Sequence, residues 1–201
     1  MTVRQPARRG AQKRIDRSAY ELFSRYGVRA VGVNTLVARA GVAKMTLYKY
    51  YPSKDELALA FLRRREALWT RSWLQRGVER TAGTPARKLL AIFDIFDKWF
   101  HRSDFEACSF VKVLLEHAES GHPLRKASVR HLDSIRLFIR ELAVEARVPD
   151  PEGFARQWQI LMMGSIVAAY AGDVDAARRA KAVATLLLAQ NETGPLSGGA
   201  A

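Results

Sequence analysis

Residues 33–50 read VNTLVARAGVAKMTLYKY, and this stretch decides the fold of the amino-terminal quarter of the chain. Apolar residues recur three and four positions apart on both sides of Gly41, which is the pattern of two short helices joined by a tight turn. Gly41 can adopt the left-handed conformation that ends the first helix, and Val42 can then fill the angle between the two helices. The stretch predicts a helix-turn-helix in which Leu36 and Leu47 face inward.

The outward face of the second predicted helix carries polar and basic side chains. Residue types of this kind suit contacts to phosphates and to base edges in the major groove of DNA. The outward set consists of Lys44, Met45, Thr46, Tyr48 and Lys49.

Positive charge is concentrated in the same region. The chain contains 33 Lys and Arg against 20 Asp and Glu, a formal net charge of +13. Twelve of these cations lie in residues 1–54, where Asp16 and Glu21 are the acids. Such an excess draws a protein toward polyanions such as nucleic acid or anionic lipid. A solvated basic face is the alternative, and the helix-turn-helix favours nucleic acid.

The rest of the chain has the pattern of a helical bundle. All seven prolines lie where helices should begin or end, and apolar residues between them recur at three and four, with no convincing period-two run. We predict an all-α fold with an amino-terminal three-helix domain (1–53), a bundle for ligand binding and dimerisation (54–191) and a disordered tail (192–201). The nine expected helices span 11–27, 34–40, 44–50, 54–79, 85–101, 108–120, 123–147, 152–171 and 174–190.

Three short segments together carry a family resemblance. They are FSRYG (23–27), AGV (40–42) and TLYKYYPSKDEL (46–57). With them, residues 14–62 resemble the DNA-binding region of the TetR family of bacterial one-component regulators. One difference is that family members commonly carry Thr just before the helix-turn-helix, where this chain has Gly32, Val33 and Asn34. Asn34 or Gly32 could cap the helix instead.

The resemblance implies that the chain binds double-stranded operator DNA through the helix-turn-helix, with Lys54 holding a phosphate at the start of the fourth helix. An alternative for Tyr48 is simple packing. The basic residues Arg8, Arg9, Lys13 and Arg14 would reach the DNA backbone or minor groove, or form a mobile arm. The predicted DNA-binding residues are Thr35, Ala43, Lys44, Met45, Thr46, Tyr48, Lys49, Tyr50 and Lys54.

A helix-turn-helix of this type reads two half-sites, so a two-fold dimer on a palindromic operator is expected. In the resembling family the last two helices pair as a four-helix bundle. The sequence is compatible with this, because the expected helix 152–171 joins large residues to the small Gly164, Ser165, Ala168 and Ala169. Burial of these residues within one subunit is the alternative.

The middle of the chain is rich in aromatic residues, most of which must form the core. The resemblance implies that they also enclose a small hydrophobic or aromatic effector whose binding releases the DNA. A repressor is the expected role, although an activator with the same fold would have the same sequence pattern. The candidate pocket residues are Phe61, Trp69, Phe96, Trp99, Phe100, Cys108, Phe110, Leu114, Phe138, Trp158 and Met162.

Other functional classes receive little support. The sequence contains no hydrolase elbow, Walker loop or dinucleotide fingerprint, so we expect neither an enzyme nor a cofactor. We expect no metal site, because the spacing of His117 and His122 does not bring ligands together on a helix. The single Cys108, the lack of a signal peptide and the lack of an apolar run long enough to span a bilayer indicate a cytoplasmic protein. A helical enzyme or an anionic-surface-binding protein remains the alternative function.

Overall fold

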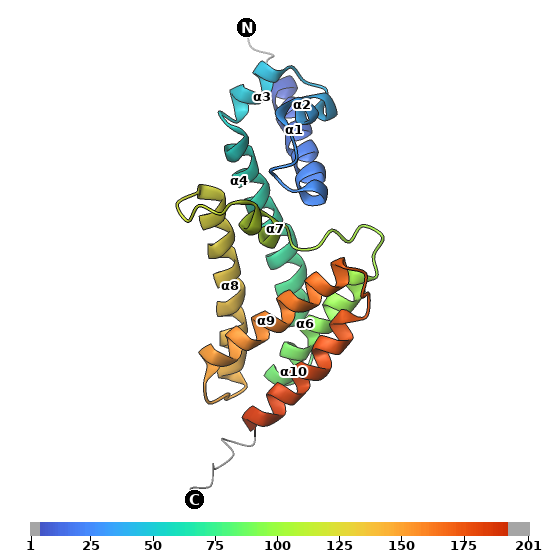
Figure 1. The fold of residues 1–201 in the computed structure, drawn as a ribbon, viewed down its shortest axis with the longest axis vertical. Coiled ribbons are helices and arrows are strands. Elements are labelled where there is room, and N and C mark those ends of the chain that lie inside the picture. Colours follow the sequence, from blue (N-terminus) through green and yellow to red (C-terminus); the bar gives the residue numbers. More distant parts are fainter. Residues whose placement is uncertain (1–4, 193–201) are drawn as a thin grey trace, which may run out of the picture. The chain divides into compact units, whose positions relative to one another are not determined.

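The computed structural model describes residues 5–192, and every regular element within them is helical (Figure 1). Helices α4 (Lys54–Arg65), η1 (Glu66–Gln75) and α5 (Arg76–Glu79) follow one another directly, so they form the single long helix expected over 54–79. The predicted all-α fold with nine helices is therefore confirmed for the described residues. The expected tail lies outside them from residue 193 onward. The elements are α1 (Gln5–Tyr26), α2 (Val33–Ala40), α3 (Lys44–Tyr50), α4 (Lys54–Arg65), the π-helical η1 (Glu66–Gln75), α5 (Arg76–Glu79), α6 (Pro85–Phe100), α7 (Ser109–Glu116), α8 (Pro123–Glu145), α9 (Pro151–Tyr170) and α10 (Ala176–Glu192).

Helices begin where capping residues stand in the sequence. The Ser53 hydroxyl accepts a hydrogen bond from the Glu56 amide (3.1 Å) at the start of α4. Thr84 does the same for the Arg87 amide (3.3 Å) before Pro85 of α6. These contacts satisfy amides that have no partner within the helix. At α2 the capping residue is Gly32, which provides no side-chain hydrogen bond.

Helix α7 ends earlier than predicted. It stops at Glu116 rather than near residue 120, and His117 has extended backbone angles. The ring of His117 contacts the Val113 carbonyl (2.8 Å), and the Arg125 guanidinium donates to the carbonyls of Leu114 (3.4 Å) and His117 (3.2 Å). Side chains therefore form hydrogen bonds with carbonyls at the end of α7, so the helix can end without leaving these carbonyls unpaired.

The chain forms two compact units. The first comprises residues 1–67 and 108–131, and the second comprises residues 68–107 and 132–201, as far as each is described. The first thus contains α1 to α4, α7 and the beginning of α8. Its core is built from the apolar stripes of α1, α2, α3 and α4, and Phe61 contacts Phe23 edge-on (5.6 Å between ring centroids). The most buried members are Ile15, Ala19, Phe23, Leu36, Leu47, Leu57, Ala58 and Phe61.

The second unit is a bundle in which α10 packs against both α6 and α9 (Figure 1). Its core is strongly aromatic: Trp99 of α6 lies 4.9 Å from Trp69 and 4.8 Å from Phe105, measured between ring centroids. Trp158 of α9 is fully buried and packs against Phe93 at 5.4 Å. Within residues 5–192, no helix combines the length and the apolar character needed to cross a membrane.

Candidate DNA-binding site

The turn between α2 and α3 has the predicted left-handed glycine. Gly41 has φ +61°, its amide donates to the Ala38 carbonyl (3.3 Å), and the Val42 amide donates to the Val37 carbonyl (3.1 Å). This pair of hydrogen bonds is the Schellman arrangement that closes a helix. The turn brings α3 away from α2 at an angle, so the two helices form a helix-turn-helix.

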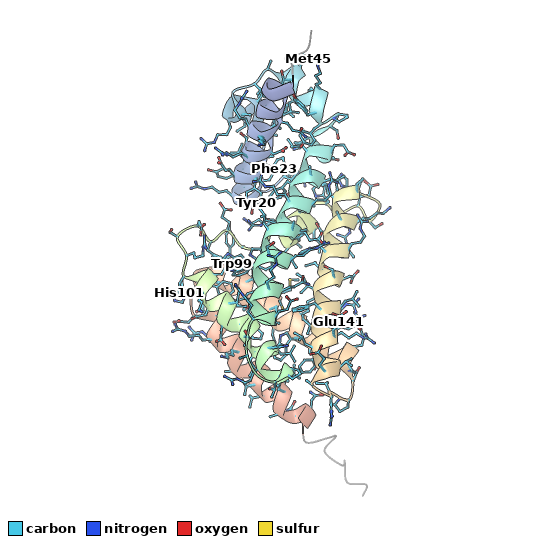
Figure 2. The ribbon with its side chains drawn as sticks, turned by 180° about the vertical axis from the view of Figure 1, so that it is seen from behind. Tyr20, Phe23, Met45, Trp99, His101 and Glu141 are labelled. Carbon is cyan, nitrogen blue, oxygen red and sulfur yellow. The ribbon has the colours of Figure 1, made fainter. Side chains whose placement is uncertain are left out.

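Helix α3 presents one face to solvent and buries the other. Leu47 is fully buried, whereas Met45 is 78% exposed. Figure 2 shows Met45 at the outer end of this unit, away from Phe23 and Tyr20. Lys44 and Lys49 are exposed too. A hollow on the surface is lined by Met45, Thr46, Tyr48 and Lys49.

The other predicted DNA-binding residues of α2 and α3 differ in their exposure. Thr35 on α2 and Ala43 before α3 are exposed, and Tyr50 is half-buried. The structure brings Met45, Thr46, Tyr48 and Lys49 together around one hollow and leaves Thr35 and Ala43 exposed, and the contact of these residues with DNA stays a prediction.

Lys54 is placed differently from its neighbours. Its ammonium group donates to the carbonyls of Val28 (3.0 Å) and Val31 (3.3 Å), which lie in the turn between α1 and α2. Two of its three protons are thus used within the protein. The structure gives Lys54 a role in holding this turn, and its phosphate contact stays a prediction.

Tyr51, which the sequence did not single out, fixes the end of α3. Its hydroxyl donates to Asp16 of α1 and accepts a hydrogen bond from the Gln12 amide (3.5 Å). Burial and the neighbouring Asp16 carboxylate raise the pKa of Tyr51 above its ordinary value of 10.0. The phenol is therefore neutral at physiological pH and can keep donating to Asp16.

Basic residues of α1 and α2 also tie the helices together. Arg14 donates to the Ala40 carbonyl (3.0 Å) at the end of α2, and Arg39 forms an ion pair with Glu21 (2.7 Å). Lys13 is exposed on α1. The side chains of Arg8 and Arg9 lie outside the described residues, so their predicted part in DNA binding stays a prediction.

Two of the histidines lie close together in the fold. The rings of His117 and His122 lie 4.3 Å apart, because the chain turns back after α7. Their spacing does not bring them together on a helix, but the turn after α7 does. His122 also pairs with Asp55 (3.4 Å) at the start of α4. Another cluster, Asp97, His101 and Asp175, has cation-binding residue types, but the Arg178 guanidinium lies 3.1 Å from each of the two carboxylates.

The candidate pocket residues divide between the two units. Phe61, Cys108, Phe110 and Leu114 belong to the first. There Phe61 is part of the helix-turn-helix core, Phe110 stacks on His131, and burial raises the pKa of the Cys108 thiol.

The other seven candidates belong to the second unit. Trp69, Phe96, Trp99 and Phe100 pack on one another, with neighbouring ring centroids 4.9 to 6.1 Å apart. Trp158 and Met162 are buried in α9. Phe138 lines a cavity of about 300 Å³ together with Gln75, Val78, Glu79, Lys88, Glu141, Leu142 and Glu145.

Known proteins share both the helix-turn-helix region and the fold. The family model described as "Bacterial regulatory proteins, tetR family" matches residues 15–61. The HTH-type transcriptional regulator YjdC of Escherichia coli (strain K12) is 23% identical over 168 residues, which cover 80% of this chain and 86% of that protein.

Solved structures extend the similarity to the whole fold. SCO4454, a TetR-family transcriptional regulator from Streptomyces coelicolor, has a TM-score of 0.84 at 21% identity, over 91% of this chain and 96% of that chain. FadR from Bacillus subtilis, solved in complex with stearoyl-CoA, has a TM-score of 0.69 at 16% identity, over 88% and 97%. The helix-turn-helix region of this chain therefore matches the TetR family of bacterial regulatory proteins, and most of the chain has the fold of TetR-family transcriptional regulators.

Proposed function

We propose that the protein is a repressor that binds a palindromic operator as a homodimer and is released from it by a small molecule. The observation that carries DNA recognition is the two-sided character of α3, in which Leu47 is buried while Lys44, Met45 and Lys49 are exposed. In this arrangement Lys44, Met45 and Thr46 read base edges at the leading end of α3. Tyr48, Lys49 and the remaining proton of Lys54 contact phosphates.

The homodimer would form through α9 and α10. Both helices expose large apolar side chains: Ile160 is 70% and Val167 58% exposed on α9, and Val183 is 50% and Leu186 66% exposed on α10. Large exposed apolar patches commonly mark an interface. Pairing these faces across a two-fold axis would present one α3 to each half-site.

The effector would bind in the aromatic second unit. The indole N–H groups of Trp69 and Trp158 are buried and have no hydrogen-bond acceptor among the residues described. A buried donor without a partner costs about 1–3 kcal/mol, so a ligand with an acceptor group would recover this energy. The complex of FadR with stearoyl-CoA supports the view that this fold accommodates a large apolar ligand. Release follows if the ligand prefers a conformation whose two α3 helices no longer match the operator.

Operator binding is tested by footprinting on the promoter of the protein's own gene. We expect a protected palindrome whose affinity falls steeply with salt. Lys44→Ala should change the sequence preference, and Lys49→Ala should weaken all sites and reduce the salt slope by about one. Binding without sequence preference would instead favour the alternative, an enzyme or anionic-surface protein with a basic face. Reporter expression in a deletion strain distinguishes a repressor from an activator.

Effector binding is tested by thermal shift with a set of small hydrophobic and aromatic compounds. A ligand specific for the folded protein raises the melting temperature by mass action. The same compound should release the operator duplex, whereas Trp158→Phe, which removes the indole N–H, should weaken both effects. If no compound changes either melting or DNA affinity, the protein is not a sensor of this class.

A further inference from the structure

We propose that Lys112 and Glu116 of α7 are positioning residues for DNA binding, because they end α1 at Tyr26 and so fix the turn that leads into the helix-turn-helix. The proposal rests on the proposed binding of an operator through α3. It adds two residues far from α3 in the sequence, neither of which is placed against DNA.

The contacts of these two residues replace two helical hydrogen bonds. The Gly27 amide donates to the Phe23 carbonyl (3.0 Å), as it would in a continuing helix. If α1 continued, the amides of residues 28 and 29 would donate to the carbonyls of residues 24 and 25. Instead, one Glu116 carboxylate oxygen accepts both amides (3.0 and 3.1 Å). The Lys112 ammonium donates to both carbonyls (3.0 and 3.4 Å).

The signs of the charges fit the end of a helix. The carbonyl end of a helix carries partial negative charge, which favours the Lys112 cation, and free amides favour the Glu116 anion. Lys112 and Glu116 are four residues apart, so they lie on the same face of α7. The helix is anchored by Phe110 and Val113, which are 2% and 1% exposed. Both charged groups are thus held in place by a packed element.

Gly27 leaves the space that Glu116 occupies. Its φ is +82°, and a Cβ added at this position would overlap the Glu116 carboxylate. A side chain at residue 27 would therefore strain the backbone and displace Glu116 as well. Lys54 holds the carbonyls of Val28 and Val31 in the same turn. The turn that enters α2 is thus held by side chains from both α4 and α7.

Loss of the Lys112 and Glu116 contacts would allow α1 to extend beyond Tyr26. Each residue added to a helix rotates the direction of the chain by about 100°. The chain would then enter α2 in a different direction, although the buried faces of α1 and α4 remain intact. We therefore expect DNA affinity to fall by more than the loss of folding stability would explain.

The test uses the full-length protein and a duplex containing the promoter segment protected by the wild type. Glu116→Gln and Lys112→Met should each weaken binding about tenfold, the loss typical of a charge-assisted hydrogen bond. The salt slope should not change, because no phosphate contact is lost. In NMR spectra, the backbone chemical shifts of residues 27–29 should move toward helical values. Thr84→Ala, which removes the α6 cap, is the control that lowers stability without touching the turn.

Gly27→Ala should also disrupt the contact of Glu116 with the end of α1, because the added methyl group displaces the carboxylate. This variant replaces Glu116→Gln if Glu116→Gln does not fold. It should weaken the duplex similarly, and Gly27→Ala combined with Glu116→Gln should bind no worse than Gly27→Ala alone. The proposal is overturned if Glu116→Gln binds like the wild type, or loses no more affinity than Thr84→Ala. A drop in the salt slope of Lys112→Met would also overturn it, by making Lys112 a phosphate ligand. If the wild type itself binds no duplex, the proposed operator binding fails instead.

Discussion

The phenol of Tyr51 links the end of α3 to α1 through a hydrogen bond. The residue follows α3 directly, and its hydroxyl binds Asp16 of α1, 35 positions earlier in the chain. Because burial and Asp16 both raise the Tyr51 pKa, the neutral phenol is the form that the folded protein prefers. The contact therefore stabilises the folded state only while the phenol keeps its proton.

Tyr51→Phe should lower the free energy of unfolding by about 1 kcal/mol at pH 7, because the hydrogen bond to Asp16 is lost. In the unfolded chain the phenol ionises near its ordinary pKa of 10.0, below its pKa in the folded state. The difference between wild type and variant should be complete below pH 10 and should disappear as the pH rises through the folded value. Urea denaturation between pH 7 and 11 measures it.

Tyr26→Phe is the matched control for this experiment, because the Tyr26 side chain is 54% exposed. It should leave both the stability and its pH dependence almost unchanged. If Tyr51→Phe differs from the wild type by the same amount at pH 11 as at pH 7, the raised pKa does not contribute to stability.

The sequence predicts some of these residues and misses others for a physical reason. Gly41 and Leu47 could be predicted, because a left-handed turn and a buried helical face both leave a local pattern. Tyr51 and Glu116 could not, because each acts on a partner far away in the chain, and helical periodicity carries no information about such pairs. Gly27 is a local signal for the end of α1, but it does not identify Glu116 as the partner.

At the scale of elements, the first residues of α4 stabilise the fold of the first unit through contacts within the protein. Ser53 caps the helix, and Lys54 in its first turn reaches back to the α1–α2 turn. The cap could be predicted from Ser53, Asp55 and Glu56, which is a local pattern. The direction of the Lys54 side chain depends on where α1 ends, which the pattern of α4 does not contain.

Lys54→Met keeps most of the aliphatic side chain but removes the ammonium group. We expect the free energy of unfolding to fall by about 1.5–3 kcal/mol, as for hydrogen bonds that involve a charged group. Lys49→Met, on the exposed face of α3, should leave unfolding unchanged and weaken DNA binding. Urea denaturation and DNA titration on both variants separate the two roles. Equal stability of the two variants would contradict the role given to Lys54.

At the scale of the whole molecule, the proposed homodimer depends on the exposed apolar residues of α9 and α10. The sequence predicted these helices and their small residues, but it did not distinguish burial within one subunit from pairing between two. The exposure of Ile160 and Leu186 in the single chain favours pairing. The two aromatic-rich regions likewise looked like one pocket in the sequence, because only the fold assigns Phe61 to the first unit and Trp99 to the second.

Ile160→Asp and Leu186→Asp should each convert the dimer to a monomer, because a carboxylate would be buried in an apolar interface. Light scattering after size exclusion should show half the wild-type mass, and DNA affinity should fall because one α3 reads only one half-site. Val144→Asp on α8 is the control, since Val144 is 51% exposed, much like Val183 on α10. A full-size dimer in both interface variants would rule out this pairing.

The burial of Cys108 makes the single thiol of the chain a chemical probe of local unfolding. It is 6% exposed, and its raised pKa keeps it in the unreactive thiol form. Iodoacetamide should therefore alkylate the Cys108 thiol only while the first unit is open. The fraction of molecules that carry one adduct, followed over time by mass spectrometry, then measures how often the unit opens. The factor by which operator DNA lowers the labelling rate would report how strongly DNA binding suppresses the opening of that unit, and no engineered probe is needed.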